Sequence, residues 1–450
     1  MIGDETQALR DAFEGLVHGR GDDGYDAARR PWQLRVDPYP AVVIEAAGAR
    51  DVQAAIRTVR EGDLPFAIQA TGHGAVPRAD GGLLLTTTAM TGVDVDPERR
   101  TARVAAGTPW SAVIEAAAPH GLAPLSGSSP TVGVVGYTLG GGAGWLSRAY
   151  GYAADSVIRA EVVTAAGELV TASATEHPDL FWALRGGGGN FGVVTELEFR
   201  LYPVERLYAG MAMFEADRAA DAVAVYREWA ADEPDECHTS LVAMTVPPVP
   251  MFPDAVRGRR VLMLRALYVG GAEAAERAIA PLRQAAGAPL MDAFREMSYA
   301  ETATLGPPPV AMASAMRIEL FGLLPDEVID IALGANGLVS GVEFHHWGGA
   351  PARPDGDAGP VGHRDVPFSV VVGAMAEDGA EGPRLQAAVD KVADRLSPHA
   401  TGGTFLNFLG DPARTESAYA PKDYRRLREV KREYDPGNFF DGNLNIPPAG

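Results

Sequence analysis

The sequence predicts an α+β protein of two domains, and two observations carry this prediction. The chain has 450 residues, 46% of them hydrophobic and 22% charged, which is typical of a globular protein but long for a single core. Its texture also changes near Leu207, where glycine clusters give way to strands interspersed with helices. That alternation predicts one sheet with helices on one face. We place the domains at 1–204 and 205–402, with 403–450 as a C-terminal segment.

Hydrophobic periodicity predicts the elements of each domain. In the first domain we expect strands at 41–46, 65–69, 83–87, 102–105, 158–164 and 193–200, and helices at 49–61 and 110–120. In the second we expect strands at 208–214, 239–245, 260–268, 316–320, 341–347 and 368–374, and helices at 219–230, 272–287, 325–335 and 383–396. After residue 402 we expect a last strand, a charged helix at 423–434 and a turn-rich tail.

Charge excludes several classes of function. The net charge is -20, whereas a nucleic-acid binder needs a basic surface. The basic residues of the helix at 423–434 alternate with acids, so we expect a solvated face there. The three lysines, Lys391, Lys422 and Lys431, lie in charge-rich segments. A Schiff-base mechanism is therefore disfavoured, because it needs a desolvated lysine.

Cysteine and histidine usage excludes further sites. Cys237 is the only cysteine, which rules out an intrachain disulfide and a CxxC zinc site and suggests a buried free thiol. His345 and His346 point to opposite faces of one strand, so they cannot both bind one metal, and we expect no metal. The chain has no run of 18 apolar residues, and residues 1–20 lack the features of a signal peptide, so we expect a cytoplasmic protein without a membrane span.

Two glycine clusters stand out, at 126–151 and 186–192. The second contains the letters GxGxxG, but the alternating strand at 193–200 follows it where a dinucleotide fingerprint requires a helix. The cluster at 140–144 fails the same test. Successive N–H groups in such loops can still bind phosphate groups. Two clusters in one domain favour a large phosphate-bearing ligand over simple tight turns.

Several segments together carry a resemblance to a known family. They are Ala70-Thr-Gly-His-Gly74, the run 126–144, Tyr150-Gly-Tyr-Ala-Ala-Asp155, the block 181–195, and the C-terminal Tyr434-Asp-Pro-Gly-Asn-Phe-Phe440 and Asn443-Leu-Asn-Ile446. This combination resembles the berberine bridge enzyme-like FAD-linked oxidases, which have the vanillyl-alcohol-oxidase, or PCMH-type, FAD fold. Segments 363–365 and 430–434 resemble those of a bacterial member. The resemblance implies an FAD domain (1–204), an antiparallel substrate domain flanked by helices (205–402), and a tail that returns to the FAD domain (403–450).

The resemblance also implies how the cofactor is held. His73 matches the histidine that bonds covalently to the flavin, and Ser129 occupies the position where many relatives add a second bond from a cysteine, so FAD attached at one point is expected. The other residues that match cofactor-binding positions are Thr71, Gly72, Gly74, Ser126, Gly127, Val132, Gly133, Gly136, Tyr137, Gly140, Gly141, Gly142, Gly144, Asp155, Gly189, Asn190, Phe191, Gly192, Val193, Asn443 and Asn445.

The strand at 341–347 is the expected catalytic strand. Alternation places Glu343, His345 and Trp347 on one face, and the resemblance aligns this strand with one that lines the active site. His345 or Glu343 is then the candidate base. Phe408 stands where relatives often have a tyrosine, which disfavours carbohydrate oxidation. The implied reaction removes hydride from a C–H bond next to nitrogen or oxygen of a small molecule, with dioxygen as acceptor and hydrogen peroxide as product. An oxygen-excluding dehydrogenase and a cyclase or isomerase stay as alternatives.

Overall fold

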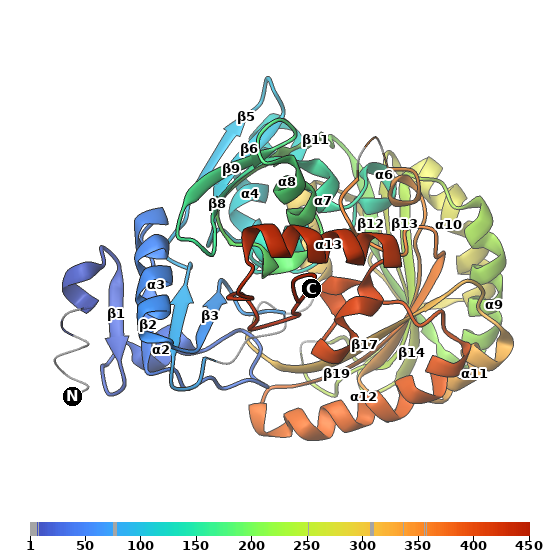
Figure 1. Ribbon diagram of the computed structural model, residues 1–450. Coiled ribbons are helices and arrows are strands. Elements are labelled where there is room, and N and C mark those ends of the chain that lie inside the picture. The colour runs from blue at the N-terminus through green and yellow to red at the C-terminus, as the bar shows by residue number, and fades with distance from the viewer. Residues whose placement is uncertain are drawn as a thin grey trace.

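The computed structural model describes residues 7, 9–74, 79–250, 252–306, 310–335, 337–354, 356 and 358–450. Residues 1–6 and 8, which belong to the segment read for a signal peptide, lie outside the described residues. The described residues form four sheets: a four-stranded, a five-stranded and a two-stranded sheet in the first 204 residues, and an eight-stranded sheet after them (Figure 1). The described helices include none long and apolar enough to cross a membrane.

The first sheet has the order β1-β2-β4-β3. Its strands are β1 (Leu16–Gly19), β2 (Val42–Glu45), β3 (Phe66–Gln69) and β4 (Leu83–Thr86); β2, β4 and β3 run parallel and β1 is antiparallel to β2. Helix α3 (Ala49–Gly62) buries Val52, Ile56 and Val59 and ends at Asp63 in the left-handed conformation. These three buried residues recur with the 3.6-residue period of a helix, so they form one apolar face, and this face packs against the buried strands. The residues after β3 form the loop that carries His73.

The second sheet is antiparallel, with the order β5-β6-β10-β8-β9. Its strands are β5 (Val93–Asp96), β6 (Thr101–Ala105), β8 (Val157–Val163), β9 (Leu169–Ser173) and β10 (Val193–Arg200), and β7 (Leu122–Ala123) pairs with β11 (Tyr202–Pro203) nearby. Trp110 of helix α4 packs against Phe199 of β10 and against Tyr137. Both glycine clusters lie beside this core.

The eight-stranded sheet is antiparallel throughout, with the order β15-β12-β14-β13-β18-β19-β17, and β16 pairs with β12. Its strands are β12 (Leu207–Glu215), β13 (Cys237–Thr245), β14 (Arg260–Val269), β15 (Pro289–Asp292), β16 (Arg295–Met297), β17 (Ala313–Phe321), β18 (Gly341–His346) and β19 (Phe368–Ala376). Four helices cover one face, where Leu264, Phe344 and Val370 are buried. The expected sheet with helices on one face is confirmed.

The helices complete the two domains and the tail. The α-helices are α2 (Tyr25–Arg29), α3, α4 (Trp110–Ala117), α5 (Val134–Leu139), α6 (Ser147–Tyr150), α7 (Ala153–Ser156), α8 (Pro178–Leu184), α9 (Ala219–Trp229), α10 (Ala272–Ala286), α11 (Asp326–Gly334), α12 (Gly382–Leu396) and α13 (Pro421–Tyr434). The 3₁₀ turns are η1 (Ala118–His120), η2 (Gly188–Asn190), η3 (Ala216–Arg218), η4 (Ala230–Asp232), η5 (Tyr299–Leu305), η6 (Ala350–Ala352), η7 (Gly379–Glu381), η8 (Ser397–His399), η9 (Leu406–Phe408) and η10 (Pro412–Ala418).

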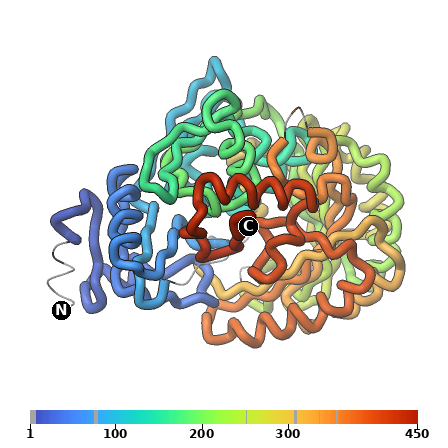
Figure 2. Tube along the Cα trace, viewed as in Figure 1, coloured from blue at the N-terminus to red at the C-terminus, as the bar shows by residue number. Residues whose placement is uncertain are grey.

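Two expectations about the C-terminal segment are wrong. No strand follows residue 402; Asn407 and Phe408 lie on the 3₁₀ turn η9, where Leu406 packs in the core of the first domain and Phe408 packs beside Leu320 and Trp347. Lys431 of α13 is not on a solvated face. Its side chain is 0% exposed and donates hydrogen bonds to Asp435 (2.6 Å), Asn190 O and Phe440 O. The tail folds back beside α13 (Figure 2), and its Phe440 carbonyl accepts one of these hydrogen bonds.

Candidate active site

His73 is fixed by contacts on three sides. The chain places it between two threonines, with Nδ1 3.0 Å from Thr71 Oγ1 and Nε2 3.1 Å from Thr131 Oγ1. Its ring stacks on Trp32, with centroids 4.4 Å apart and planes 14° from parallel. Burial lowers the pKa of His73 to about 4, so the imidazole is neutral at neutral pH. Hydroxyl groups can donate or accept, and both tautomers of the neutral ring are therefore satisfied.

Gly72 allows this loop to turn. Its φ is +71°, and a Cβ atom there would lie 2.5 Å from Pro31 Cβ, so both the conformation and the space favour glycine. Thr71 Oγ1 also accepts a hydrogen bond from Gly133 N at 3.1 Å, which ties the histidine loop to the long glycine-rich run. Ser129 Oγ lies 3.2 Å from Thr131 Oγ1. Gly74 is exposed at the end of the loop.

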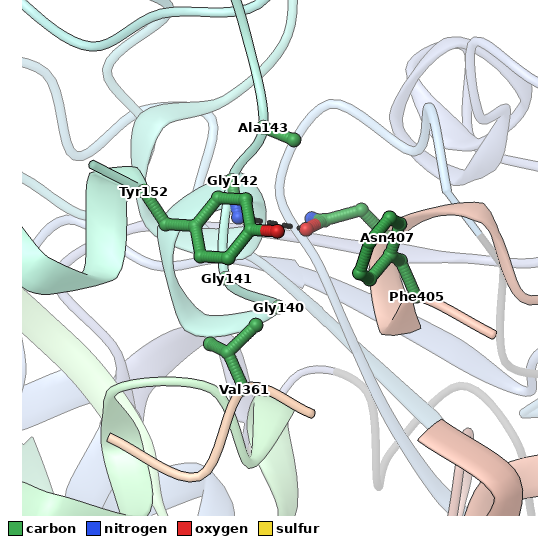
Figure 3. A pocket seen from close by; sticks show the side chains of 8 residues that line it. All are labelled: Gly140, Gly141, Gly142, Ala143, Tyr152, Val361, Phe405 and Asn407. Atoms are coloured by element: carbon green, nitrogen blue, oxygen red, sulfur yellow. Dashed lines mark hydrogen bonds between the residues drawn. The ribbon is translucent and has the colours of Figure 1, made fainter. Parts of the chain in front are cut away.

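The glycines at 140–144 form a tight loop that Asn407 holds. Asn407 Oδ1 accepts from Gly142 N at 2.7 Å and its Nδ2 donates to Tyr137 O at 2.9 Å. A Cβ atom on Gly142 (φ +76°) would lie 2.5 Å from the Tyr137 ring, and one on Gly144 would lie 2.0 Å from Ser126 O. The loop needs glycine for its own packing. It borders a small pocket, drawn in Figure 3, lined by Gly140, Gly141, Gly142, Ala143, Tyr152, Val361, Phe405 and Asn407.

The other residues that match cofactor positions lie around this loop. Ser126, Gly127, Val132 and Gly133 precede α5, Gly136 and Tyr137 lie within it, Gly189 and Asn190 lie in η2, Phe191, Gly192 and Val193 lead into β10, and Asn443 and Asn445 are in the tail. The side chains of Asp155 and Asn190 form hydrogen bonds with other residues of the protein. Both oxygens of Asp155 bind Arg364, at 2.7 and 2.9 Å. Asn190 binds Gly187 O, Leu444 O and Ile446 N.

Unpartnered polar atoms in the described parts of the first domain and the tail fit a ligand with many hydrogen-bonding groups. Among the described residues, no partner exists for the buried Gln69 Oε1, Thr86 Oγ1, Tyr137 OH, Thr138 Oγ1 and Asn445 Oδ1. Buried polar atoms without partners are rare in native proteins. Gly136 and Gly189 also face open space, because a Cβ atom on either would meet nothing within 4 Å. These features suit the flavin, ribityl and phosphate groups of FAD.

The candidate catalytic residues share the sheet face that carries no helices. Glu343 and His345 lie on it as alternation predicts, with 3.9 Å between Glu343 Oε1 and His345 Nδ1. Trp347, just beyond β18, stacks on His345 with centroids 4.0 Å apart. The His345 ring is thus enclosed, and its Nε2 is buried without a partner among the described residues. Burial, with nearby Arg265, holds the pKa of His345 well below its usual value.

Three further residues on or above this face were not predicted from the sequence. His238 of β13 contacts the edge of His345 at 4.7 Å, and Trp145 contacts His238 at 5.6 Å. Arg265 of β14 lies over Trp145 and 3.7 Å from Glu343. Ser240 pairs with both Arg265 and His345 across the strands. The register between neighbouring strands brings these side chains together. Because a local sequence pattern does not determine that register, these residues could not be predicted from the sequence. Phe408 packs near Trp347 and Phe405.

His346 lies on the opposite face, in a buried ionic network. Its Nδ1 is 2.5 Å from Glu233 Oε2, and its backbone N–H donates to Tyr226 OH at 2.9 Å. Arg148, from α6 of the first domain, lies 3.5 Å from Glu233 and donates to the carbonyl of Cys237 at 2.7 Å. Cys237 itself is buried and free, as expected. The described residues hold no cluster of side chains that would bind a metal ion.

Comparisons with known proteins agree with this architecture. A model of an FAD binding domain matches residues 40–173, and a model described as berberine and berberine like matches residues 404–447. (R)-6-hydroxynicotine oxidase of Paenarthrobacter nicotinovorans is 31% identical over 98% of each chain, and an FAD-linked oxidoreductase of Dictyostelium discoideum is 26% identical over 97% of this chain and 96% of its own.

Solved structures show the same fold. 6-Hydroxy-D-nicotine oxidase from Arthrobacter nicotinovorans superposes with a TM-score of 0.85 at 28% identity, covering 97% of this chain and 98% of its own. The berberine bridge enzyme-like protein 1 of Physcomitrella patens gives 0.88 at 21% identity, covering 99% of both. The chain belongs to the berberine bridge enzyme-like family of FAD-linked oxidoreductases. It is therefore an FAD-dependent oxidoreductase with a two-domain α+β fold.

Proposed function

We propose that the protein is an oxidase that removes a hydride from a C–H bond next to nitrogen or oxygen of a small organic substrate. The substrate loses that hydride and one proton, and dioxygen takes both to become hydrogen peroxide. When bound, FAD supplies the two-electron acceptor. The relative at 31% identity is named an oxidase, which supports dioxygen as the final acceptor.

His73 is the proposed point of covalent attachment. Only a neutral imidazole has a free ring-nitrogen lone pair, and the lowered pKa of His73, about 4, keeps the ring in that form. Stacking on Trp32 and the two threonine hydroxyls fix its orientation. Ser129 has no sulfur to form a second bond, so attachment is expected at one point.

Glu343 is the proposed base. We prefer it to His345 because its side chain is more accessible. The side chain of Glu343 is 24% exposed on the open face, whereas His345 Nε2 is covered by protein and the His345 ring is enclosed between Trp347 and His238. A base must reach the proton that it removes. Glu343 accepts the proton from the substrate nitrogen or oxygen.

Anaerobic reduction of the bound flavin by a panel of amines and alcohols tests this proposal. A substrate that bleaches wild type should bleach Glu343→Gln at least about 100-fold more slowly, as loss of a general base predicts. Glu215→Gln, at the exposed end of β12, is the matched control and should keep the wild-type rate. Admitting air should then yield peroxide in step with product. An unchanged rate in Glu343→Gln would remove Glu343 from the mechanism, and a flavin that stays reduced in air would indicate an acceptor other than dioxygen.

A further inference from the structure

The side chain of Arg265 lies on the proposed substrate face and forms no hydrogen bond with a described residue. It is in the middle of β14, and its side chain is only 22% exposed. Its Nε is buried without a partner. The nearest carboxylate atom, Glu343 Oε1, is 3.7 Å from Nη2, too far for a hydrogen bond. Its guanidinium carbon also lies over the ring of Trp145, 5.1 Å from the ring centroid.

Two other largely buried arginines form hydrogen bonds with the protein through their guanidinium groups, although Nε of Arg364, like that of Arg265, is buried without a partner among the described residues. Arg148 donates to the carbonyls of Cys237 and Glu233, at 2.7 and 2.9 Å. Arg364 forms a two-point contact with Asp155, at 2.7 and 2.9 Å. Arg265 differs from them because no nitrogen of its guanidinium forms a hydrogen bond with a described residue, so its Nη atoms are available to an acceptor from outside the chain.

The surroundings of Arg265 suit a ligand with an anionic end and an apolar body. Met211 and Ser240 flank it directly across the neighbouring strands. One row further along the same face lie Met263 and Val242, in an apolar cluster. The planar fork of arginine matches the two oxygens of a carboxylate, which accept two parallel hydrogen bonds. The methionine side chains can adapt to an aromatic or aliphatic group beside it.

We propose that Arg265 binds a carboxylate of the substrate, so that the enzyme acts on small organic acids whose oxidised C–H bond lies close to Glu343. This inference rests on the proposed function, because it takes the face of Glu343 as the substrate site. Arg265 is then a residue that determines specificity, and Glu343 handles the proton on the same molecule.

Benzoate binding to the FAD-loaded protein tests the inference, with benzamide as a neutral molecule of nearly the same shape. Calorimetry should show that wild type binds benzoate more tightly than benzamide. In Arg265→Gln, benzoate binding should weaken about 10- to 100-fold, the range expected from losing hydrogen bonds to a charged group, and benzamide binding should change little. Arg260→Gln, which removes an exposed charge from the same strand, should leave both unchanged.

The outcomes separate the two proposals. Absence of benzoate binding, equal binding of benzoate and benzamide, or wild-type benzoate affinity in Arg265→Gln with an unchanged melting temperature would each overturn the carboxylate site. The absorbance spectrum of the flavin tests the other proposal, that the face of Glu343 is the site of oxidation. If benzoate binding depends on Arg265 but leaves the flavin spectrum undisturbed, the carboxylate site stands and the face of Glu343 is not the site of oxidation.

Discussion

The imidazole of His73 stacks on the indole of Trp32, 4.4 Å away and within 14° of parallel. This contact joins the loop after β3 to the segment that precedes β2. The same segment hydrogen-bonds the loop backbone, from Trp32 N to Thr71 O and from Gln33 N to Gly72 O. The orientation of His73 is therefore set before any ligand arrives.

Acid precipitation of the purified protein should leave the flavin attached, because we place a covalent bond at His73. His73→Ala should release the flavin into the supernatant, while Ser129→Ala should retain it. A tryptic map should contain one flavin-bearing peptide, the one with His73. A second such peptide, or release of flavin from wild type, would contradict single-point attachment.

Stability of the flavin-free protein should decline as the pH falls from about 6.5 to about 4. Because burial lowers the pKa of His73 from 6.5 to about 4 in the folded protein, the unfolded chain binds a proton first in this interval, and protonation favours unfolding. Chemical denaturation at several pH values measures the effect. The stability difference between wild type and His73→Gln should shrink across the interval; a constant difference would show that His73 is not protected from protonation.

His346→Ala should destabilise the protein by about 1–3 kcal/mol, since the buried carboxylate of Glu233 would lose a hydrogen-bond partner. His399→Ala is the matched control, because His399 makes only a 3.9 Å surface contact with Glu327 and such pairs contribute little. Thermal melting of both variants distinguishes them. Equal melting temperatures would mean that the network of Arg148, Glu233 and His346 does not hold the sheet.

Lys431→Ala should cost about 3–5 kcal/mol, the range for breaking one partner of a buried ion pair, because Asp435 would keep an uncompensated charge. Lys422→Ala, at an exposed position of the same helix, should be near neutral. Denaturant titration provides the values. If Lys431→Ala proves as mild as Lys422→Ala, the buried pair contributes nothing to holding the tail.

Local pattern predicted most elements of the fold. The alternating, β-branched run 193–200 gave β10 with its observed bounds, and the 3.6-residue period gave α3. The last strand expected after residue 402 is wrong, because Leu406–Phe408 form the 3₁₀ turn η9 there. The edge strand β16 was missed, since three residues with two charges carry no strand pattern.

The sequence predicted only those residues of the candidate catalytic site that lie on a single strand. Glu343 and His345 share β18, so alternation placed them on one face. Arg265 and His238 reach that face from β14 and β13 through pairings such as Ser240 with Arg265. Lys431 was misjudged for a similar reason, because its own helix is charged and the burial comes from the returning tail.

Both glycine loops depend on residues near the C-terminus, which are synthesised last. The hydrogen bonds concerned are those of Asn407, Asn190 and Lys431. Asn407 forms a hydrogen bond with Gly142, and Asn190 forms hydrogen bonds with Leu444 and Ile446. In each case the two residues are more than 250 positions apart, so the bonds of both glycine loops form only after the later residue has been synthesised. A nascent chain still on the ribosome lacks those partners. A chain that stops before residue 404 would keep His73 but lack Asn407, and so would lack the hydrogen bonds that hold the glycine loop at 140–144.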